Sequence, residues 1–254
     1  MKRLVTALAL VPVVIYAVLF ANYWVFLSVL MAVALLCYYE YSGIAASYGF
    51  GSLNPVGYAA GVLLLAWPGE AWPVVTIAAL VALAAAMRGD LSKTLPRAAL
   101  LLMGVVYVFG CWQCAIPLHE HNRHWLMYAL VLNWAGDSGA YYVGRAFGKH
   151  RMAPEISPKK SWEGAAASLA TSVLVGGAYS LRFIPGVSIA GAIGLTVAAN
   201  AAGQLGDLAE SAIKRGASVK DSSAILPGHG GFLDRVDSTL FTLPVIYLWI
   251  KLAG

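Results

Sequence analysis

The sequence LVTALALVPVVIYAVLF, residues 4–20, contains no charged side chain, and a second long apolar run follows it at residues 23–46. Hydrophobic residues make up 60% of the 254 positions and charged residues only 11%, whereas a soluble domain carries about 25% charged residues. A bilayer supplies the apolar surroundings that such a chain needs, and long unbroken runs favour helices over barrel strands, which alternate with period two. We therefore predict an all-α, polytopic integral membrane protein whose first run is an uncleaved transmembrane helix.

Nine apolar segments are candidates for transmembrane helices, each of which needs about 20 mostly apolar residues. They are residues 4–20, 23–46, 55–68, 72–87, 97–117, 125–146, 164–181, 187–213 and 237–252. The third and fourth are short, so the sequence leaves open whether they cross fully or form a re-entrant pair. We expect one membrane domain over residues 1–254, in which 1–130 supply helices and 131–254 form a catalytic region with cytoplasmic loops.

Basic residues gather on one side of the membrane if all nine segments cross. Fourteen of the 17 Lys and Arg residues then share a side: Lys2, Arg3, Arg88, Lys93, Arg97, Arg145, Lys149, Arg151, Lys159, Lys160, Lys214, Arg215, Lys220 and Arg235. Because basic loops mark the cytoplasmic side, we predict a cytoplasmic N-terminus, an external 118–124 loop and an external C-terminus, in the cell inner membrane. The same rule explains the net charge of +5 without a nucleic-acid partner.

Acidic residues occur within or at the ends of these segments, where charged groups are costly and usually functional. Asp137 lies late in the sixth segment among small residues, and Tyr141 and Arg145 follow on the same helical face. A second face, late in the eighth segment, carries Asp207, Glu210, Ser211 and Lys214. Close helix packing around Asp137, and stabilising charge pairs along the second face, are the purely structural alternatives.

The segment VKDSSAILPGHGGFLDRVDS, residues 219–238, combines glycines with charged residues. Its three glycines around His229 allow a tight loop whose backbone amides can face a phosphate. Asp234 and Asp237 would share a face if residues 233–240 begin the last helix. Two such acids suit magnesium, which binds one or two carboxylates together with phosphate oxygens, although they also suit the positive end of a helix dipole.

The loop between Arg145 and Glu163 is basic and contains Lys159 and Lys160 next to Pro158. Such lysines bind either anionic lipids or the phosphates of a substrate. Carboxylates, lysines and a glycine loop together favour phosphoryl or nucleotidyl transfer, because this chemistry depends on charge neutralisation and positioning.

The stretch SAIKRGASVKDSSAILPGHGGFLDRVD, residues 211–237, resembles the signature of the phosphatidate cytidylyltransferase, or CDP-diacylglycerol synthase, family in its bacterial type. Its 27 positions show no departure from that pattern, and residues 137–149 and 156–164 are also similar. The resemblance implies that CTP and phosphatidic acid yield CDP-diacylglycerol and pyrophosphate. It further implies dependence on Mg²⁺, as one ion, two ions or a divalent ion with K⁺, and an assembly that is often a homodimer.

The resemblance also implies roles for individual residues. The metal would be held by Asp207 and Asp234, with Asp221, Asp237 and then Asp137 as the next candidates. The catalytic group would be Asp207, Asp234, Lys214, Asp221, Lys220, His229 and Arg235. The substrate-binding group would be Lys159, Lys160, Ser211, Arg215, Gly230, Gly231, Asp137 and Arg145. For His229 a positioning role is favoured over proton transfer, because a phosphate monoester is already largely ionised near neutral pH.

Two other functions fit the same features less closely. One is a CTP-dependent kinase of a polyprenol or another lipid alcohol. The other is an ion-coupled transporter, which would carry acids through the depth of the bilayer. Most acids here lie toward the predicted cytoplasmic ends beside loop lysines, which favours chemistry at the membrane surface.

Overall fold

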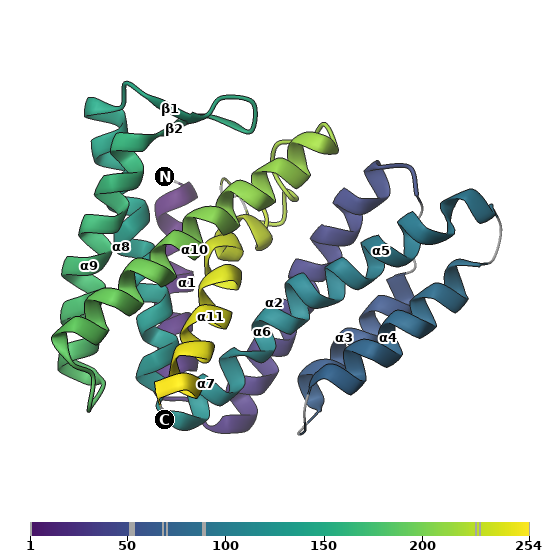
Figure 1. Ribbon diagram of the computed structural model, residues 1–254, viewed down its shortest axis with the longest axis horizontal. Coiled ribbons are helices and arrows are strands. Elements are labelled where there is room, and N and C mark those ends of the chain that lie inside the picture. The colour runs from purple at the N-terminus through teal and green to yellow at the C-terminus, as the bar shows by residue number, and fades with distance from the viewer. Residues whose placement is uncertain are drawn as a thin grey trace. The chain divides into compact units, whose positions relative to one another are not determined.

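The computed structural model describes residues 2–50, 54–67, 69, 71–87, 90–226, 228 and 230–253, and most of them are helical (Figure 1). The longer helices are α1 (Lys2–Leu19), α2 (Tyr23–Ser47), α3 (Asn54–Ala66), α4 (Ala71–Ala86), α8 (Arg123–Phe147), α9 (Trp162–Phe183), α10 (Ile189–Gly216) and α11 (Leu233–Ala253). The fifth predicted segment corresponds to several short helical pieces between α4 and α8. Each of the nine predicted segments therefore coincides with helix, which confirms the all-α prediction.

Within the part of the chain that the structure describes, four segments are long and apolar enough to cross a membrane: Tyr23–Ser47, Leu91–His121, Trp162–Phe183 and Ile189–Gly216. Large apolar side chains on shorter and longer helices alike face outward, with Trp24 73% exposed, Trp72 69% and Leu80 63%. Lipid tails are the surroundings in which such side chains are stable. The protein is an all-α membrane protein, in which α3 and α4 are shorter apolar helices.

The fifth segment is less regular than the single helix predicted over 97–117. It consists of η1 (Leu91–Lys93), α5 (Thr94–Gly104), η2 (Val105–Gly110), α6 (Cys111–Gln113) and α7 (Ala115–His121). η2 is a π-helical turn, which widens the helix locally. The residues of this turn are as apolar as their neighbours, so their hydropathy does not distinguish a π-helical turn from an α-helix. The apolar pattern therefore predicted the helix but not its interruption.

The helices group into two compact units that alternate along the chain. The first contains residues 1–11, 22–113 and 213–235, and the second contains residues 12–21, 114–212 and 236–254. In the first unit α3 packs against α2, α4 and η2, around buried aromatic rings. In the second unit α8 and α9 lie side by side along most of their length (Figure 1). The predicted change of character near residue 130 stays a prediction.

Small residues allow α8 and α9 to approach closely. A Cβ atom on Gly136 would lie 2.7 Å from the Oγ atoms of both Ser168 and Ser172, and one on Gly139 would lie 2.3 Å from Oγ1 of Thr171. Small residues at helix contacts are typical of membrane bundles. Close helix packing, the structural alternative for the small residues around Asp137, is therefore present between α8 and α9.

The basic loop after α8 forms a short hairpin that the sequence analysis did not predict. Strands β1 (Arg151–Ala153) and β2 (Ser157–Ser161) pair antiparallel between the end of α8 and the start of α9 (Figure 1). The Ser161 hydroxyl accepts a hydrogen bond from the Gly164 N–H at 3.2 Å and caps α9. Strands as short as these do not show the alternating apolar pattern by which a strand is recognised in a sequence. The sequence therefore did not indicate the hairpin.

Candidate functional site

In the first unit, many of the polar residues predicted to act in the reaction lie in or beside the segment that joins α10 to α11. The guanidinium of Arg215 donates to the Val219 carbonyl at 2.9 Å, and Ser218 adopts a positive φ of 60°, so the chain turns sharply after α10. α11 begins at Leu233, which confirms that Asp234 and Asp237 lie in its first two turns. Residues 217–232, which we call the connecting loop, carry three of the seven predicted catalytic residues, Lys220, Asp221 and His229, and the other four lie in α10 and α11.

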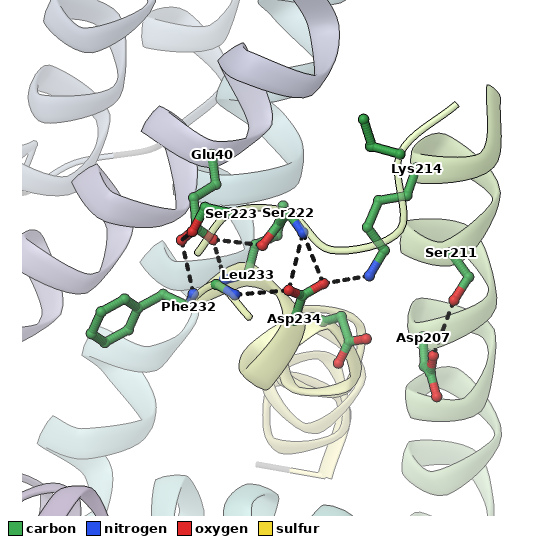
Figure 2. A network of polar contacts seen from close by, with 12 residues as sticks. Glu40, Asp207, Ser211, Lys214, Ser222, Ser223, Phe232, Leu233 and Asp234 are labelled. Carbon is green, nitrogen blue, oxygen red and sulfur yellow. Dashed lines mark hydrogen bonds and ion pairs between the residues drawn. The ribbon is translucent and has the colours of Figure 1, made fainter. Parts of the chain in front are cut away.

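Asp234 is held by several donors at the start of α11. Its carboxylate accepts hydrogen bonds from the N–H groups of Ser222, at 3.0 and 3.2 Å, and Gly231, at 2.8 Å, and forms an ion pair with Lys214 (Figure 2). The side chains of Asp234 and Lys214 are only 5% and 9% exposed. A nearby cation and backbone donors both stabilise the ionised carboxylate. The connecting loop thus fixes the position of Asp234.

Glycines bring the connecting loop against this carboxylate. Gly228 and Gly230 have φ values of 79° and 77°, a backbone conformation that favours glycine. A Cβ atom on Gly230 would lie 2.5 Å from Oδ2 of Asp234 and 3.5 Å from Cβ of Asp221. The predicted tight glycine loop is present at these positions. His229 lies outside the described residues, so its role stays a prediction.

A cavity of about 530 Å³ lies beside the connecting loop. Its lining includes five residues that the sequence analysis placed at the site or next to it: Lys220, Asp221, Ser223, Gly230 and Arg235. Two cationic side chains beside glycine backbone form surroundings that attract phosphate groups. The structure therefore brings Lys220, Asp221, Gly230 and Arg235 together.

A second cavity, of about 620 Å³, lies within the second unit among α8, the hairpin, α9 and α10. Six charged side chains line it: Asp137, Arg145, Arg151, Lys159, Lys160 and Asp207. Its volume falls within the range of about 300–1,000 Å³ that is usual for small-molecule sites. Arg145 Nη1 donates to the Tyr141 hydroxyl at 3.1 Å, and both residues line the cavity with Asp137, which confirms that the three share one helical face.

Asp207 forms an ion pair with Lys160, with 2.7 Å between Oδ2 and Nζ. The side chains are 34% and 25% exposed, and the Ser211 hydroxyl donates weakly to Asp207 Oδ1 at 3.5 Å.

The carboxyl of Asp237 lies within electrostatic range of the carboxyls of Asp207, Glu210 and Asp137. α10 and α11 approach closely there, since a Cβ atom on Gly206 would lie 2.6 Å from the Asp237 carbonyl oxygen.

The acids fit a magnesium ion only together with a phosphate ligand. Among the residues that the structure describes, no three His, Cys, Asp or Glu side chains are grouped so as to hold a metal ion. Magnesium does not require such a group, because it usually binds one or two carboxylates, water and substrate phosphates. Asp207 and Asp234 each offer a carboxylate beside a lysine, so the donor chemistry suits an ion that arrives with an anionic substrate.

Two charged residues in or beside these sites were not predicted as site residues. Glu40, in α2, accepts hydrogen bonds from four groups in residues 222–233 (Figure 2). Its signal in the sequence is an acid within an apolar segment, a location that is costly without partners. Arg151 lines the larger cavity, but in the sequence it contributed only to the charge bias of the loops.

Comparisons with known proteins identify similar sequences in several bacteria. A protein of Bacillus subtilis named phosphatidate cytidylyltransferase is 37% identical over 162 residues, which cover 63% of this chain and 60% of that protein. One of the same name from Haemophilus influenzae is 46% identical over 49% of this chain and 44% of its own length. One from Staphylococcus aureus strain COL is 39% identical over 74% of this chain and 75% of its own length.

The matched stretches thus span less than two thirds of the Bacillus and Haemophilus proteins and three quarters of the Staphylococcus protein. The likeness to the family as a whole is more extensive. The sequence profile of the cytidylyltransferase family matches residues 1–253, which include both cavities and the connecting loop. On this match over nearly the full length, the chain belongs to the cytidylyltransferase family.

Proposed function

We propose that this protein transfers the cytidylyl group of CTP to phosphatidic acid and releases pyrophosphate, so that CDP-diacylglycerol forms. The observation that carries the proposal is the folded arrangement of residues 211–237, where glycine backbone, Lys214 and the buried carboxylate of Asp234 meet. The relatives named phosphatidate cytidylyltransferase support the choice of substrates. The apolar helices support a substrate that stays in the bilayer.

Both cavities suit phosphate-bearing groups. Lys220 and Arg235 line the smaller one, and a larger set of cations lines the other: Arg145, Arg151, Lys159 and Lys160. CTP and phosphatidic acid together carry four phosphoryl groups, so their binding requires several cations. We assign the phosphates of both substrates to these side chains, and Ser211 and Arg215 on α10 stay predicted substrate-binding residues.

The reaction proceeds by displacement at phosphorus. An oxygen of the lipid phosphate forms a bond to the α-phosphorus of CTP, and the bond to the oxygen between the α- and β-phosphorus atoms breaks. Pyrophosphate leaves with that electron pair. A phosphate monoester loses its second proton near pH 6, so the attacking oxygen needs no general base. The protein positions the lipid phosphate against the α-phosphate of CTP and offsets the negative charge of both groups. These two tasks are the main requirement of such transfers.

Magnesium would reduce the charge on the phosphate oxygens when it is bound. Asp207 and Asp234 would hold it, with Asp221 and Asp237 as further candidates, and a second divalent ion or K⁺ stays a prediction. Asp234 is already ionised and held in place by Ser222 and Gly231, so it needs no proton transfer before it binds a cation.

We further propose that the site faces the cytoplasm in the cell inner membrane and that the protein forms a homodimer. The concentration of basic residues in one set of loops supports the orientation. CTP is a cytosolic nucleotide, so this orientation gives the site access to it. Crosslinking in native membranes, read as the mass of the product, tests the dimer.

The decisive experiment is an assay with purified protein, phosphatidic acid, Mg²⁺ and CTP labelled at its α-phosphorus. We expect the label to move to the lipid, with one pyrophosphate released for each lipid product, and a chelator to stop both. Asp234→Asn should remove this activity. Glu155→Gln, at an exposed acid of the hairpin that lines neither cavity, should retain it.

The same assay separates the alternatives. A CTP-dependent kinase would transfer label from the γ-phosphorus to a lipid alcohol and leave no cytidine on the lipid. A transporter would move ions or solutes across proteoliposomes in the absence of CTP. Failure of the wild-type protein to transfer α-label to phosphatidic acid would overturn the proposed function.

A further inference from the structure

Glu40 occupies an unusual place for a carboxylate. It lies in α2, a helix long and apolar enough to cross a membrane, and only 1% of its surface is exposed. A buried charge is strongly unfavourable unless hydrogen bonds or opposite charges compensate for it. The surroundings of Glu40 must therefore supply that compensation.

Four donors surround the Glu40 carboxylate, two at each oxygen. Oε1 accepts from the Ser223 hydroxyl at 2.6 Å and the Phe232 N–H at 2.9 Å. Oε2 accepts from the Ser222 hydroxyl at 2.9 Å and the Leu233 N–H at 2.7 Å. Figure 2 shows all four bonds converging from one side of α2. An ionised carboxylate accepts hydrogen bonds only, so this arrangement matches its charged form.

These donors come from both ends of the glycine-containing part of the connecting loop. Ser222 and Ser223 precede it, and Phe232 and Leu233 follow it at the start of α11. The first N–H groups of a helix lack partners within that helix, and Glu40 supplies them from α2. One side chain therefore joins the two ends of the loop and caps α11, which carries Asp234 in its first turn.

Glu40 and Asp234 are also connected through shared neighbours. Ser222 donates its hydroxyl to Glu40 and its backbone N–H to Asp234. A Cβ atom on Gly231 would lie 2.4 Å from Oε2 of Glu40, and the Gly231 N–H donates to Asp234. Glu40 itself lines neither cavity. A displacement of Glu40 would thus displace the groups that hold Asp234.

We propose that Glu40 is a positioning residue: its carboxylate holds residues 222–233 in the conformation that places Asp234 and the glycine backbone for reaction. It does so without touching a substrate. This role rests on the proposed function, since it assigns Glu40 to the same site and the same transfer.

The test compares Glu40→Gln with the wild-type protein. Gln has the same shape, but its amide nitrogen is a donor and would face two donors of the loop. We expect kcat to fall about 10–100-fold, as for partners that orient metal ligands, and the Mg²⁺ concentration for half-maximal activity to rise. Hydrogen exchange, followed by mass spectrometry, should accelerate in residues 222–233 and remain unchanged in α2.

Further variants keep the test decisive if Glu40→Gln folds poorly. Glu40→Asp retains the charge with a shorter reach and should recover part of the activity. The Ser222→Ala/Ser223→Ala double variant removes two donors and leaves Glu40 intact, and it should raise the same Mg²⁺ requirement. Its effect should be less than additive with Glu40→Gln, because the two changes break the same contacts. Ser42→Ala, a buried position on α2 whose hydroxyl donates to the Tyr39 carbonyl, is the matched control.

The outcomes distinguish this inference from the proposed function. Wild-type kcat, Mg²⁺ requirement and loop exchange in Glu40→Gln would overturn the positioning role. So would a uniform loss of thermal stability with unchanged kinetics per folded molecule, since that result indicates packing alone. If the wild-type protein forms no CDP-lipid, the proposed function fails, and the exchange of residues 222–233 alone decides whether Glu40 holds the loop.

Discussion

Lys214 and Asp234 form an ion pair in which the two side chains are only 9% and 5% exposed. Removal of one partner from such a pair leaves an uncompensated buried charge, which costs about 3–5 kcal/mol of stability. We therefore expect Lys214→Met to lower the midpoint of thermal unfolding in detergent. Asp234→Asn should also lower it, although the amide can retain some of the backbone hydrogen bonds.

The double variant Lys214→Met/Asp234→Asn makes this prediction specific. It removes both charges, so its unfolding midpoint should lie above that of Lys214→Met even though neither protein transfers cytidylyl groups. A double variant less stable than either single variant would show that the pair is not the source of the effect.

Lys160 and Asp207 form a more exposed pair, at 25% and 34%, and this difference predicts different consequences. A pair at this exposure contributes only about 0.2–1 kcal/mol, so Lys160→Ala should unfold at nearly the wild-type temperature. Its KM for a phosphate-bearing substrate should rise about tenfold or more, because a hydrogen bond to a charged group contributes about 1.5–3 kcal/mol. Lys149→Ala removes an exposed charge that lines neither cavity and should leave KM unchanged.

Gly230 combines a positive φ of 77° with contact against Asp234. Gly230→Ala would place a methyl group against that carboxylate and would add about 1–2 kcal/mol of backbone strain. We expect kcat to fall about 10²-fold, as for small displacements of reacting groups, while the protein still purifies as folded material. Gly194→Ala, at an open position on α10, is the control, and equal losses in both variants would contradict the geometric explanation.

Cysteine labelling tests the predicted orientation. The protein has three free cysteines, Cys37, Cys111 and Cys114. All three are first replaced, so that the introduced cysteine is the only thiol that the maleimide can label. Glu155→Cys, in the hairpin, should react with a membrane-impermeant maleimide only in inverted vesicles. Glu120→Cys, in the loop predicted outside, should react only in right-side-out vesicles. The reverse pattern would mean that the site faces away from the cytoplasm.

The helices and the main polar segment could be predicted because their signals are local. An apolar run indicates a helix whatever lies around it, and residues 211–237 carry their glycines and charges in one continuous stretch. The start of α11 could be placed for the same reason, since Asp234 and Asp237 lie at helical spacing beside a glycine loop.

The partners of these residues could not be predicted, because they depend on contacts between distant parts of the chain. Glu40 and Leu233 are 193 positions apart, and nothing near Glu40 in the sequence indicates the loop that it holds. The sequence analysis placed Lys160 in the substrate-binding group and Lys214 in the catalytic group, whereas the structure also pairs them with Asp207 and Asp234. The sequence shows which residues are charged, but it does not show which of them form ion pairs with one another.

The junction between β2 and α9 has a consequence for how this protein family can change. β2 ends at Ser161 and α9 begins at Trp162, so no flexible spacer separates Lys160 from the helix. One inserted residue would rotate the strand by about 100° and shift it by about 1.5 Å relative to α9. Homologous proteins should therefore vary in length at the tip of this hairpin, around residues 154–156, and keep the strand-to-helix spacing constant.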